Sequence, residues 1–431
     1  MKRSSLNIGI IGIGNIGLQV LKQLTLSSQL NKLFSVESVL VRDKQKYTKI
    51  ISEDNEFKNE IDNVLEKITD NEEDFFSNNI DVLIELIGGI DPAYRYVKRA
   101  LESKKHVVTA NKDLIATHIE ELLQLSKDNS VKLRFEGSVG AGIPIIEVLS
   151  DMLKQNQIKK ITGIINGTSN YILSSMFENS SDFEDVLKEA QDLGFAESDP
   201  TNDVEGFDAK FKINILGSIA FGTRIPLENV YVKGISEVSN KDMNYAKEFG
   251  YNIKLLAVTE KSSEGIYSNV SPALVSLNQP ISKVGGNYNA VEILGDLVGN
   301  LWIQGEGAGK NSTSSAVLGD LMGIYYRSSD DVNLSGNKEK YLSKEEVMLR
   351  NYIRLSVEDK YGVLSEISGI FSKNEISIAS VIQKDIDNDK NVVDLVIMTH
   401  DSKGVNFDIA IDSVSKISSV KEKPVVIRIN D

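Results

Sequence analysis

The sequence contains no cysteine and three histidines, His106, His118 and His400. The absence of cysteine excludes disulfides, thiolate metal sites and cysteine nucleophiles, and it fits a reducing compartment, so we expect a cytoplasmic protein. The histidines are scattered along the chain, which disfavours a metal site built from several imidazoles. No apolar run approaches about 18 residues, so we expect no membrane-spanning segment.

Basic residues are in the minority, with 48 lysines and arginines against 62 aspartates and glutamates and a net charge of −14. Binding to nucleic acid requires a basic surface, so this balance disfavours DNA and RNA as partners. The first residues, MKRSSLNIGIIGIG, lack a long apolar core followed by a cleavage site, and we expect no signal peptide.

A glycine pattern stands near the start of the chain. Residues 6–17, LNIGIIGIGNIG, place an apolar, β-branched run before Gly12-x-Gly14-x-x-Gly17, and a helical pattern follows. Strand, glycine turn and helix are the context of a dinucleotide-binding fingerprint, in which the helix N-terminus offers N–H groups to a pyrophosphate. We therefore expect a Rossmann-type nucleotide-binding domain, and a purely structural glycine turn is the alternative.

The charges after the next strand bear on the choice of cofactor. The strand predicted over residues 35–41 is followed by Arg42, Asp43 and Lys44. An acidic residue at this place binds the ribose hydroxyls of NAD, whereas a basic residue pairs with the 2′-phosphate of NADP. Arg42 and Lys44 therefore favour NADP, and Asp43 keeps NAD open.

Several later turns also follow predicted strands. Ligands of open α/β sheets collect at the carboxyl ends of the strands, so we expect Gly88 and Lys112 near the cofactor, with a solvent-exposed lysine as the alternative for Lys112. Glu136, beside a glycine-rich turn, offers oxygen ligands to a hard cation or marks a tight domain crossover. The turn at residues 166–170, NGTSN, is either a substrate contact or a helix cap. Residues 305–309, which include Gly307, predict a second phosphate-accepting helix start and a return to the cofactor domain.

An acidic stretch, residues 194–212 (GFAESDPTNDVEGFDAKFK), holds five carboxylates and two lysines. Asp199-Pro200 predicts a helix start, with Asp199 as N-cap and Pro200 at the first helical position. Asp208 and Lys212 are four residues apart and share a helix face, where an acid beside a lysine can orient a polar substrate and move a proton. A solvated, charge-paired helix start is the alternative.

The end of the chain predicts a separate small domain. Residues 326–348 are polar, lack periodicity and read as a linker, and residues 349–431 repeat the order βαββαβ of a ferredoxin-like unit. The predicted fold class is α/β. It comprises a Rossmann-type domain over residues 1–137 with a return segment at about 300–325, an α+β substrate and dimerisation domain over residues 138–299, and the small domain.

The lack of cysteine and the scarcity of histidine also limit which dehydrogenase reactions the protein can catalyse. Aldehyde oxidation through a thiohemiacetal needs a cysteine, and the histidine–carboxylate pair of 2-hydroxy acid dehydrogenases is disfavoured by the scattered histidines. Direct hydride transfer between an alcohol and a carbonyl remains, with a lysine handling the proton.

Seven segments from about Leu6 to Leu321 resemble the homoserine dehydrogenase family, in the family's order, and the small domain resembles an ACT domain. The segments are GIGNIG, IELIGGIDPA, TANKDLIA, EGSVGAGIPII, INGTSNYIL, GFAESDPTNDVEGFDAKFKINIL and GEGAGKNSTSSAVLGD. The resemblance implies an NAD(P)-dependent interconversion of L-homoserine and L-aspartate 4-semialdehyde, within the biosynthesis of threonine, methionine and isoleucine.

The resemblance also implies roles for individual residues. Lys112, Lys212 and Asp208 would be catalytic, while Glu197, Asp203, Gly167 and Thr168 would hold the substrate. The implied cofactor contacts are Gly12, Gly14, Asn15, Ile16, Gly17, Arg42, Lys44, Gly88, Lys112 and Gly307. Glu136, with main-chain oxygens of Val139, Ala141 and Ile143, resembles the family's site for a monovalent cation, Na⁺ or K⁺.

The resemblance leaves partners and regulation as expectations. We expect a homodimer or homotetramer, with L-threonine as the effector of the ACT domain and a ligand-free dimerisation module as the alternative. Another ACT-bearing Rossmann dehydrogenase and a catalytically inactive amino-acid sensor are the competing functions. On one continuous helix from Pro200, Asp203 and Asp208 would point about 140° apart, so we expect the chain to bend at Gly206.

Overall fold

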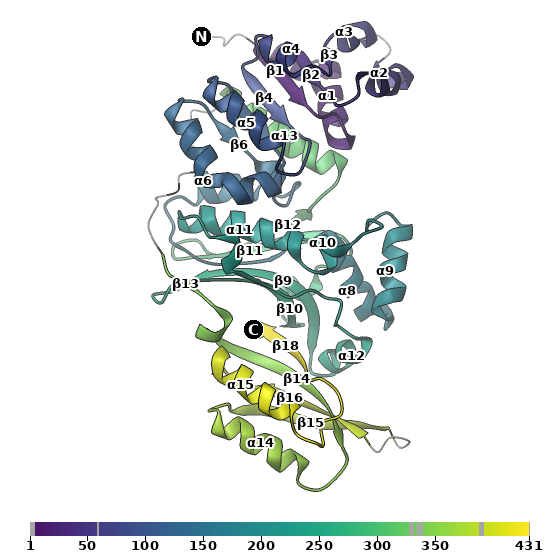
Figure 1. The fold of residues 1–431 in the computed structure, drawn as a ribbon, viewed down its shortest axis with the longest axis vertical. Coiled ribbons are helices and arrows are strands. Elements are labelled where there is room, and N and C mark those ends of the chain that lie inside the picture. The colour runs from purple at the N-terminus through teal and green to yellow at the C-terminus, as the bar shows by residue number, and fades with distance from the viewer. Residues whose placement is uncertain are drawn as a thin grey trace. The chain divides into compact units, whose positions relative to one another are not determined.

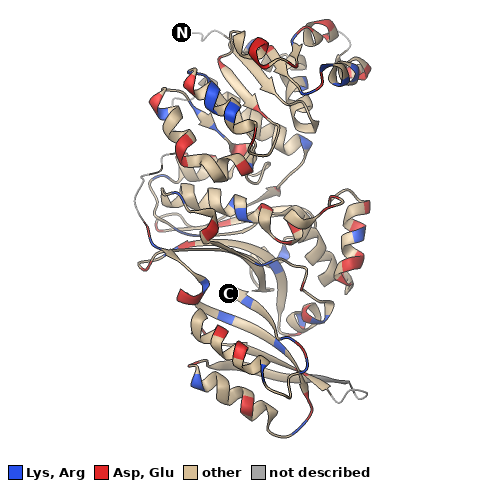
Figure 2. Cartoon of the chain, viewed as in Figure 1, with Lys and Arg blue, Asp and Glu red and all other residues tan. Residues whose placement is uncertain are grey.

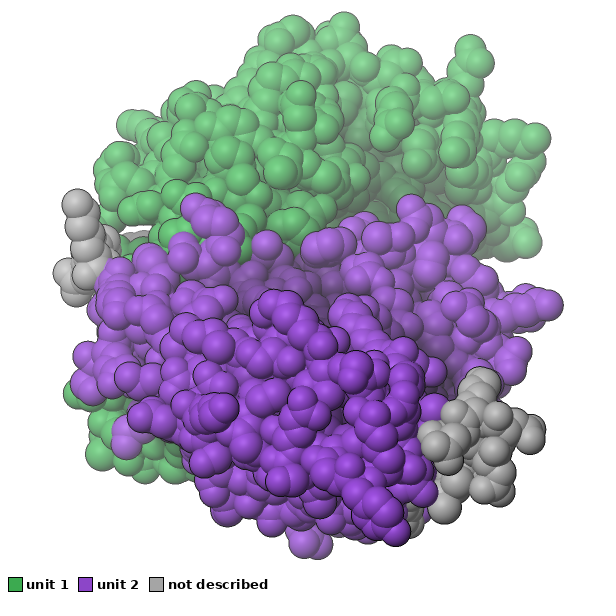
Figure 3. All heavy atoms as spheres, turned by 60° about the horizontal axis from the view of Figure 1, so that its bottom comes forward, with its two compact units in different colours: residues 1–158, 211–227, 292–338 green, residues 159–210, 228–291, 339–431 purple. Residues whose placement is uncertain are grey.

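The computed structural model describes residues 5–57, 60–326, 332, 334, 339–387 and 392–430. Within them the chain divides into two compact units, coloured separately in Figure 3. Unit 1 comprises residues 1–158, 211–227 and 292–338, and unit 2 comprises residues 159–210, 228–291 and 339–431. The predicted linker, residues 326–348, includes positions that lie outside the described residues (327–331, 333 and 335–338).

Unit 1 is built on a parallel sheet of six strands in the order β3-β2-β1-β4-β5-β6 (Figure 1). This is the strand order of a doubly wound dinucleotide-binding domain, and it confirms the predicted Rossmann-type fold. The strands are β1 (Leu6–Ile11), β2 (Phe34–Leu40), β3 (Ile68–Thr69), β4 (Val82–Glu85), β5 (His106–Thr109) and β6 (Leu133–Arg134).

Helices pack on this sheet because its strands are apolar on both faces. The helices are α1 (Asn15–Leu26), α2 (Lys44–Glu53), α3 (Ile61–Leu65), α4 (Glu72–Ser77), α5 (Ala93–Glu102), α6 (Lys112–Asp128), α7 (Ile145–Glu147) and α13 (Lys310–Tyr326). Although α13 is distant in sequence, its Val317 and Leu321 share one core with Ile8 and Ile10 of β1 and with Val20 of α1. Strand β12 (Gly299–Glu306) leads into α13.

Unit 2 contains a mixed sheet in which the strands follow the order β11-β7-β9-β10-β18-β14-β16-β15. Its first part comprises β7 (Ile158–Ile164), β8 (Val230–Val232), β9 (Tyr251–Lys261), β10 (Ile266–Ser276) and β11 (Tyr288–Gly295). The helices α8 (Gly167–Asn179), α9 (Phe183–Asp192), α10 (Thr201–Val204) and α12 (Asn240–Glu248) belong to this part. Helix α11 (Phe207–Phe221) begins in unit 2 and continues into residues of unit 1.

The C-terminal part of unit 2 has the predicted order βαββαβ, with one short additional strand. Its elements are β14 (Met348–Glu358), α14 (Val363–Lys373), β15 (Ile378–Asp387), β16 (Val392–Thr399), β17 (Ser402–Lys403), α15 (Gly404–Ser415) and β18 (Val425–Asn430). Helices α14 and α15 lie beside each other on the strands of this part (Figure 1). Ile353, Leu355 and Phe371 belong to its buried core. Strand β18 also pairs in parallel with β10, so this small domain continues the sheet of the substrate domain.

The charges are distributed over both units. Figure 2 shows acidic and basic positions interspersed along the helices, in keeping with a chain that carries both signs in quantity. In the described part of the chain, no helix is long and apolar enough to cross a membrane.

Candidate active site

The glycine turn after β1 has the geometry that a pyrophosphate requires. Gly12 has a φ of +87°, and a Cβ on Gly17 would lie 2.1 Å from the Gly12 oxygen, so neither position accepts a side chain. Gly14 precedes α1 as its N-cap, and a Cβ there would have no heavy atom within 4 Å. Asn15 and Ile16 are the first residues of α1, and the open helix N-terminus is therefore free to receive an anion.

At the end of β2, the acidic and basic side chains are used differently. Asp43 caps α2, and its Oδ1 accepts a hydrogen bond of 2.9 Å from the Lys46 main-chain N–H. Arg42 and Lys44 are exposed beside it. The carboxylate that would bind a ribose is thus engaged in capping, while two cationic side chains face solvent.

A buried carboxylate organises the carboxyl ends of β4 and β5. Glu85 Oε2 accepts a hydrogen bond of 2.6 Å from Thr109 Oγ1, and its Oε1 accepts one of 2.8 Å from the Ile87 N–H. Burial raises the pKa of Glu85, because the charged form loses its hydration. These bonds place the turn that holds Gly88 beside the end of β5. Sequence reasoning missed Glu85, whose signal was a single acid at the end of an apolar strand.

Asn111 connects the same turn to the predicted catalytic lysine. Its Nδ2 donates to the Gly89 oxygen at 2.6 Å, and its Oδ1 accepts from the Leu114 N–H at 3.1 Å as the N-cap of α6. Lys112 is the first residue of that helix and is half-buried. The structure therefore brings Gly88 and Lys112 to one edge of the sheet, and Asn111 is a second residue that sequence reasoning left without a role.

The predicted cation ligands lie in one turn of unit 1. Glu136 is 7 % exposed, and its carboxylate oxygens accept hydrogen bonds of 2.8 Å each from the Ile146 and Glu147 N–H groups. Burial raises the pKa of Glu136 to about 7. Its main-chain N–H donates to Asp320 Oδ2 at 2.8 Å, which ties the turn to α13.

The main chain around Glu136 is folded tightly. Gly140 and Ala141 have φ values of +68° and +26°, and the Ile143 N–H donates to the Gly140 oxygen at 2.7 Å. The Gly142 N–H donates to the Glu306 oxygen at 2.9 Å, which brings this turn next to Gly307. The described residues contain no group of three or more metal-ligating side chains, so a cation here depends on Glu136 and on main-chain oxygens such as those of Val139, Ala141 and Ile143.

The acidic stretch bends where its residue types predicted. Helix α10 ends at Val204 and α11 begins at Phe207, and Gly206 between them has a φ of +80°, which confirms the expected bend. The start of α10 differs from the prediction by one residue. Asp199 Oδ1 accepts hydrogen bonds from both the N–H and the hydroxyl of Thr201, so the helix begins at Thr201, after Pro200.

One amide brings two of the predicted carboxylates together. Asn166 Nδ2 donates to Asp203 Oδ1 at 2.7 Å and to Asp208 Oδ2 at 2.9 Å. Its Oδ1 accepts from the Ser169 N–H at 2.8 Å, so the same side chain caps α8. The sequence left the turn of Asn166 open as a substrate contact or a helix cap. It did not predict these bonds to the two carboxylates, which link residues 37 and 42 positions apart.

The other predicted substrate residues lie around the start of α8 and before α10. A Cβ on Gly167 would lie 2.8 Å from the Asn287 oxygen, and Thr168 Oγ1 donates to the Phe195 oxygen at 2.7 Å. Glu197 is exposed, and its main-chain oxygen accepts from Gln191 Nε2 at 3.0 Å. Asn166 thus donates to the carboxylates of Asp203 and Asp208 and not to that of Glu197.

Asp208 and Lys212 lie one turn apart on α11. Both are buried, with 6 % and 8 % of their surfaces exposed, although neither belongs to the apolar core. A buried acid and a buried lysine on one helix face are the side chains that sequence reasoning selected for proton transfer.

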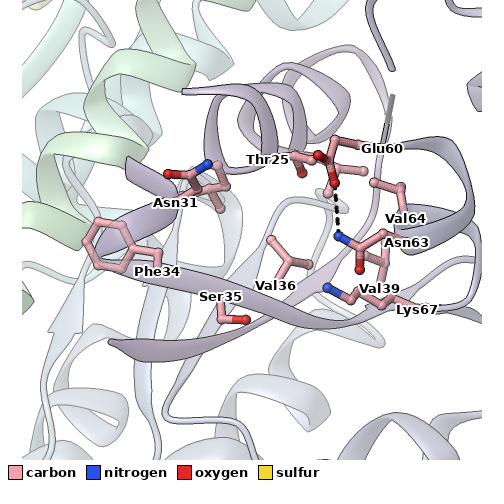
Figure 4. Close-up of a pocket in the computed structure, with 12 residues that line it drawn as sticks. Thr25, Asn31, Phe34, Ser35, Val36, Val39, Glu60, Asn63, Val64 and Lys67 are labelled. Atoms are coloured by element: carbon pink, nitrogen blue, oxygen red, sulfur yellow. Dashed lines mark hydrogen bonds between the residues drawn. The ribbon is translucent and has the colours of Figure 1, made fainter. Parts of the chain in front are cut away.

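Unit 1 also has a pocket away from the predicted site residues (Figure 4). It has a volume of about 170 Å³ and is lined by the second half of α1, the start of β2 and residues near α3, including Leu24, Phe34, Val36, Asn63 and Lys67. Asn63 Nδ2 donates to Glu60 Oε2 at its rim. Because this hollow lies toward the amino ends of the strands, it is at the end of the sheet opposite to the glycine turn.

Comparisons with known proteins agree on one family. Residues 144–322 match the homoserine dehydrogenase family, residues 12–136 match its NAD-binding domain and residues 351–411 match the ACT domain. A homoserine dehydrogenase of Bacillus subtilis is 36% identical over 97% of this chain and 96% of its own. The crystal structure of a homoserine dehydrogenase from Thiobacillus denitrificans has a TM-score of 0.91 at 35% identity and covers 99% of both chains. A hyperthermophilic archaeal homoserine dehydrogenase solved with NADPH has a TM-score of 0.63 at 28% identity, covering 76% of this chain and all of its own.

Proposed function

Because this chain belongs to the homoserine dehydrogenase family and is an NAD(P)-dependent oxidoreductase with an ACT domain, we propose which of its residues carry out the reaction. The observation that carries the proposal is the pair of hydrogen bonds by which Asn166 holds Asp203 and Asp208 together, with Lys212 one turn further along α11. A lysine next to two fixed carboxylates provides both a proton acceptor and an anchor for an ammonium group.

The proton chemistry belongs to the lysines. Oxidation of L-homoserine removes a hydride from the carbinol carbon and a proton from the hydroxyl oxygen, and NADP, when bound, would supply the acceptor for the hydride. Lys212 accepts the hydroxyl proton, and in the reverse direction it returns that proton to the aldehyde oxygen. Lys112 stabilises the negative charge that develops on the same oxygen. Asp208 orients Lys212 from one turn away.

Recognition of the substrate belongs to the acidic residues. Asp203 and Glu197 bind its ammonium group, and the Asn166 amide fixes the carboxylate of Asp203 in the required orientation. Gly167 and Thr168 contact the substrate at the start of α8. The turn accepts no side chain at Gly167, because a Cβ there would lie 2.8 Å from the Asn287 oxygen.

The cofactor is NADP. Gly12, Gly14, Asn15, Ile16 and Gly17 would hold its pyrophosphate. The fit rests on the open space at Gly14, where a Cβ would have no heavy atom within 4 Å, and on the tight turn that Gly12 and Gly17 allow. The exposed Arg42 and Lys44 bind the 2′-phosphate, because Asp43 is engaged as a helix cap. The archaeal relative solved with NADPH supports this choice. Gly88 and Gly307 would contact other parts of NADP.

A monovalent cation, Na⁺ or K⁺, is held by Glu136 and the main-chain oxygens of Val139, Ala141 and Ile143. The donor set fits a hard cation, because it consists of oxygens and includes one buried carboxylate that a positive charge would stabilise.

In the ACT domain, L-threonine is the effector, and the protein assembles as a homodimer or homotetramer.

A spectrophotometric assay of NADPH consumption with L-aspartate 4-semialdehyde tests the central assignment. Lys212→Ala should abolish turnover while the dissociation constant for NADPH stays within about twofold, because Lys212 is remote in sequence from the glycine turn. Lys210→Ala is the matched control, since Lys210 lies on the same helix but off the face of Asp208. Near-normal kcat in Lys212→Ala would remove this lysine from the mechanism.

A further inference from the structure

A buried lysine outside the proposed active site holds part of the substrate domain in place. Lys254 of β9 is 1 % exposed. Its Nζ donates to the Val284 oxygen at 2.7 Å, to Ser174 Oγ at 2.8 Å and to Asn170 Oδ1 at 3.1 Å. The three N–H donors of the ammonium thus meet three oxygens, all of them on neutral groups.

The lysine fixes the orientation of a buried amide. Because Asn170 Oδ1 accepts from Lys254, the amide nitrogen must point the other way. There Nδ2 donates to the main-chain oxygens of Val284, Gly286 and Tyr288, at 3.2, 2.9 and 3.2 Å. Lys254 and Asn170 together therefore hold the segment 284–288 at four main-chain contacts, two of them to the Val284 oxygen.

This segment packs against the start of α8. A Cβ on Gly167 would lie 2.8 Å from the Asn287 oxygen, so the segment and the first turn of α8 are in close contact. The preceding residue is Asn166, whose amide holds Asp203 and Asp208. A displacement of the segment 284–288 would therefore move the turn from which both carboxylates are oriented.

We propose that Lys254 is a positioning residue for substrate binding, acting through Asn170 and the segment 284–288 on the Asn166-Gly167 turn. This inference rests on the proposed function, because it assigns to that turn the orientation of the substrate-binding carboxylates. Burial lowers the pKa of Lys254 to about 8, which leaves the ammonium as the main form at neutral pH. A charged group at such depth costs free energy unless it is hydrogen-bonded, and the three oxygens around Lys254 Nζ provide those bonds.

Two substitutions test the contacts that lead from Lys254 through Asn170 to the segment 284–288, one at each of the two side chains. Lys254→Met keeps the length of the side chain and removes its three donors. Asn170→Asp keeps an oxygen for Lys254, and supplies a charge to pair with it, but removes the donor to the segment 284–288. Each variant should raise KM for L-homoserine about tenfold, the effect of losing one ordinary hydrogen bond, with kcat and KM for NADP within about twofold. The double variant should show no further increase, because both changes break one path.

The control is Thr259→Val. Thr259 lies on β9, the strand that carries Lys254, and the substitution removes its buried hydrogen bond of 2.7 Å to Ser268 of β10. It should lower the thermal midpoint without changing KM for L-homoserine. If Asn170→Asp is folded and its KM for L-homoserine is normal, the inference is wrong. The inference is equally wrong if KM for NADP rises together with KM for L-homoserine. It is also wrong if the double variant raises KM for L-homoserine by the product of the two single effects. Absence of homoserine oxidation in the wild type would instead overturn the proposed function itself.

Discussion

Replacing Asp242 with asparagine should strongly destabilise the part of the protein that joins the substrate and ACT domains. Asp242 of α12 is fully buried, and its carboxylate accepts hydrogen bonds from Arg354 Nε at 2.7 Å, Arg354 Nη2 at 3.1 Å, Tyr352 Oη at 3.1 Å and Ser239 Oγ at 2.5 Å. Arg354 belongs to β14 and is itself largely buried. Asp242→Asn leaves that guanidinium without its counter-charge, and breaking a buried pair in this way costs about 3–5 kcal/mol.

Urea-induced unfolding followed by far-UV circular dichroism measures this cost against the wild type. The control is Asp408→Asn, which breaks the partly exposed ion pair with Lys344 in the same domain and should cost no more than about 1 kcal/mol. Replacing both partners, in Asp242→Leu/Arg354→Met, should recover much of the loss, because no uncompensated charge remains. If Asp242→Asn and Asp408→Asn unfold at the same urea concentration, the buried pair does not stabilise the junction as argued.

Three further predictions concern the cofactor, the cation and a buried lysine. Arg42→Ala should weaken NADP binding about tenfold or more and NAD binding less than twofold, measured by fluorescence titration, and an equal effect on both would remove the phosphate role. Glu136→Gln should abolish any rise in thermal midpoint that K⁺ or Na⁺ produces in the wild type, and a rise of equal size in the variant would place the cation elsewhere. Because burial lowers the pKa of Lys254 to about 8, the folded protein binds this proton less readily than the unfolded chain. The wild type should therefore gain stability relative to Lys254→Met as the pH rises from about 8 to 10, and a constant difference in the free energy of unfolding would contradict the burial effect.

The parts that the sequence predicted well depend on local rules. The turn at Gly12, Gly14 and Gly17 follows from three glycines between a strand and a helix, and the structure shows the steric constraint directly at Gly12 and Gly17. The bend at Gly206 likewise followed from the periodicity of a helix and from the position of one glycine. In both cases the deciding residues lie within a few positions of each other.

The parts that the sequence did not predict depend on contacts between distant residues. The capping role of Asn166 follows from the residue type, but its bonds to Asp203 and Asp208 arise because α8 and the start of α11 are brought together in the fold. The role of Glu85 likewise requires that β4 and β5 be neighbours in the sheet. No spacing in the sequence identifies either contact, because an amide or a buried acid is compatible with many partners.

The ACT domain and the substrate-binding turn are connected through one sheet, and this connection predicts the form that regulation takes. Strand β14 pairs with β18, β18 with β10, and β10 with β9, the strand that carries Lys254. Helix α12, which is bound to β14 through Asp242, also packs on β9. A ligand that shifts the ACT strands would therefore also shift β9 and Lys254, which position the substrate turn. We expect L-threonine to raise KM for L-homoserine while KM for NADP stays constant. An effect confined to KM for NADP would show that regulation travels by another route.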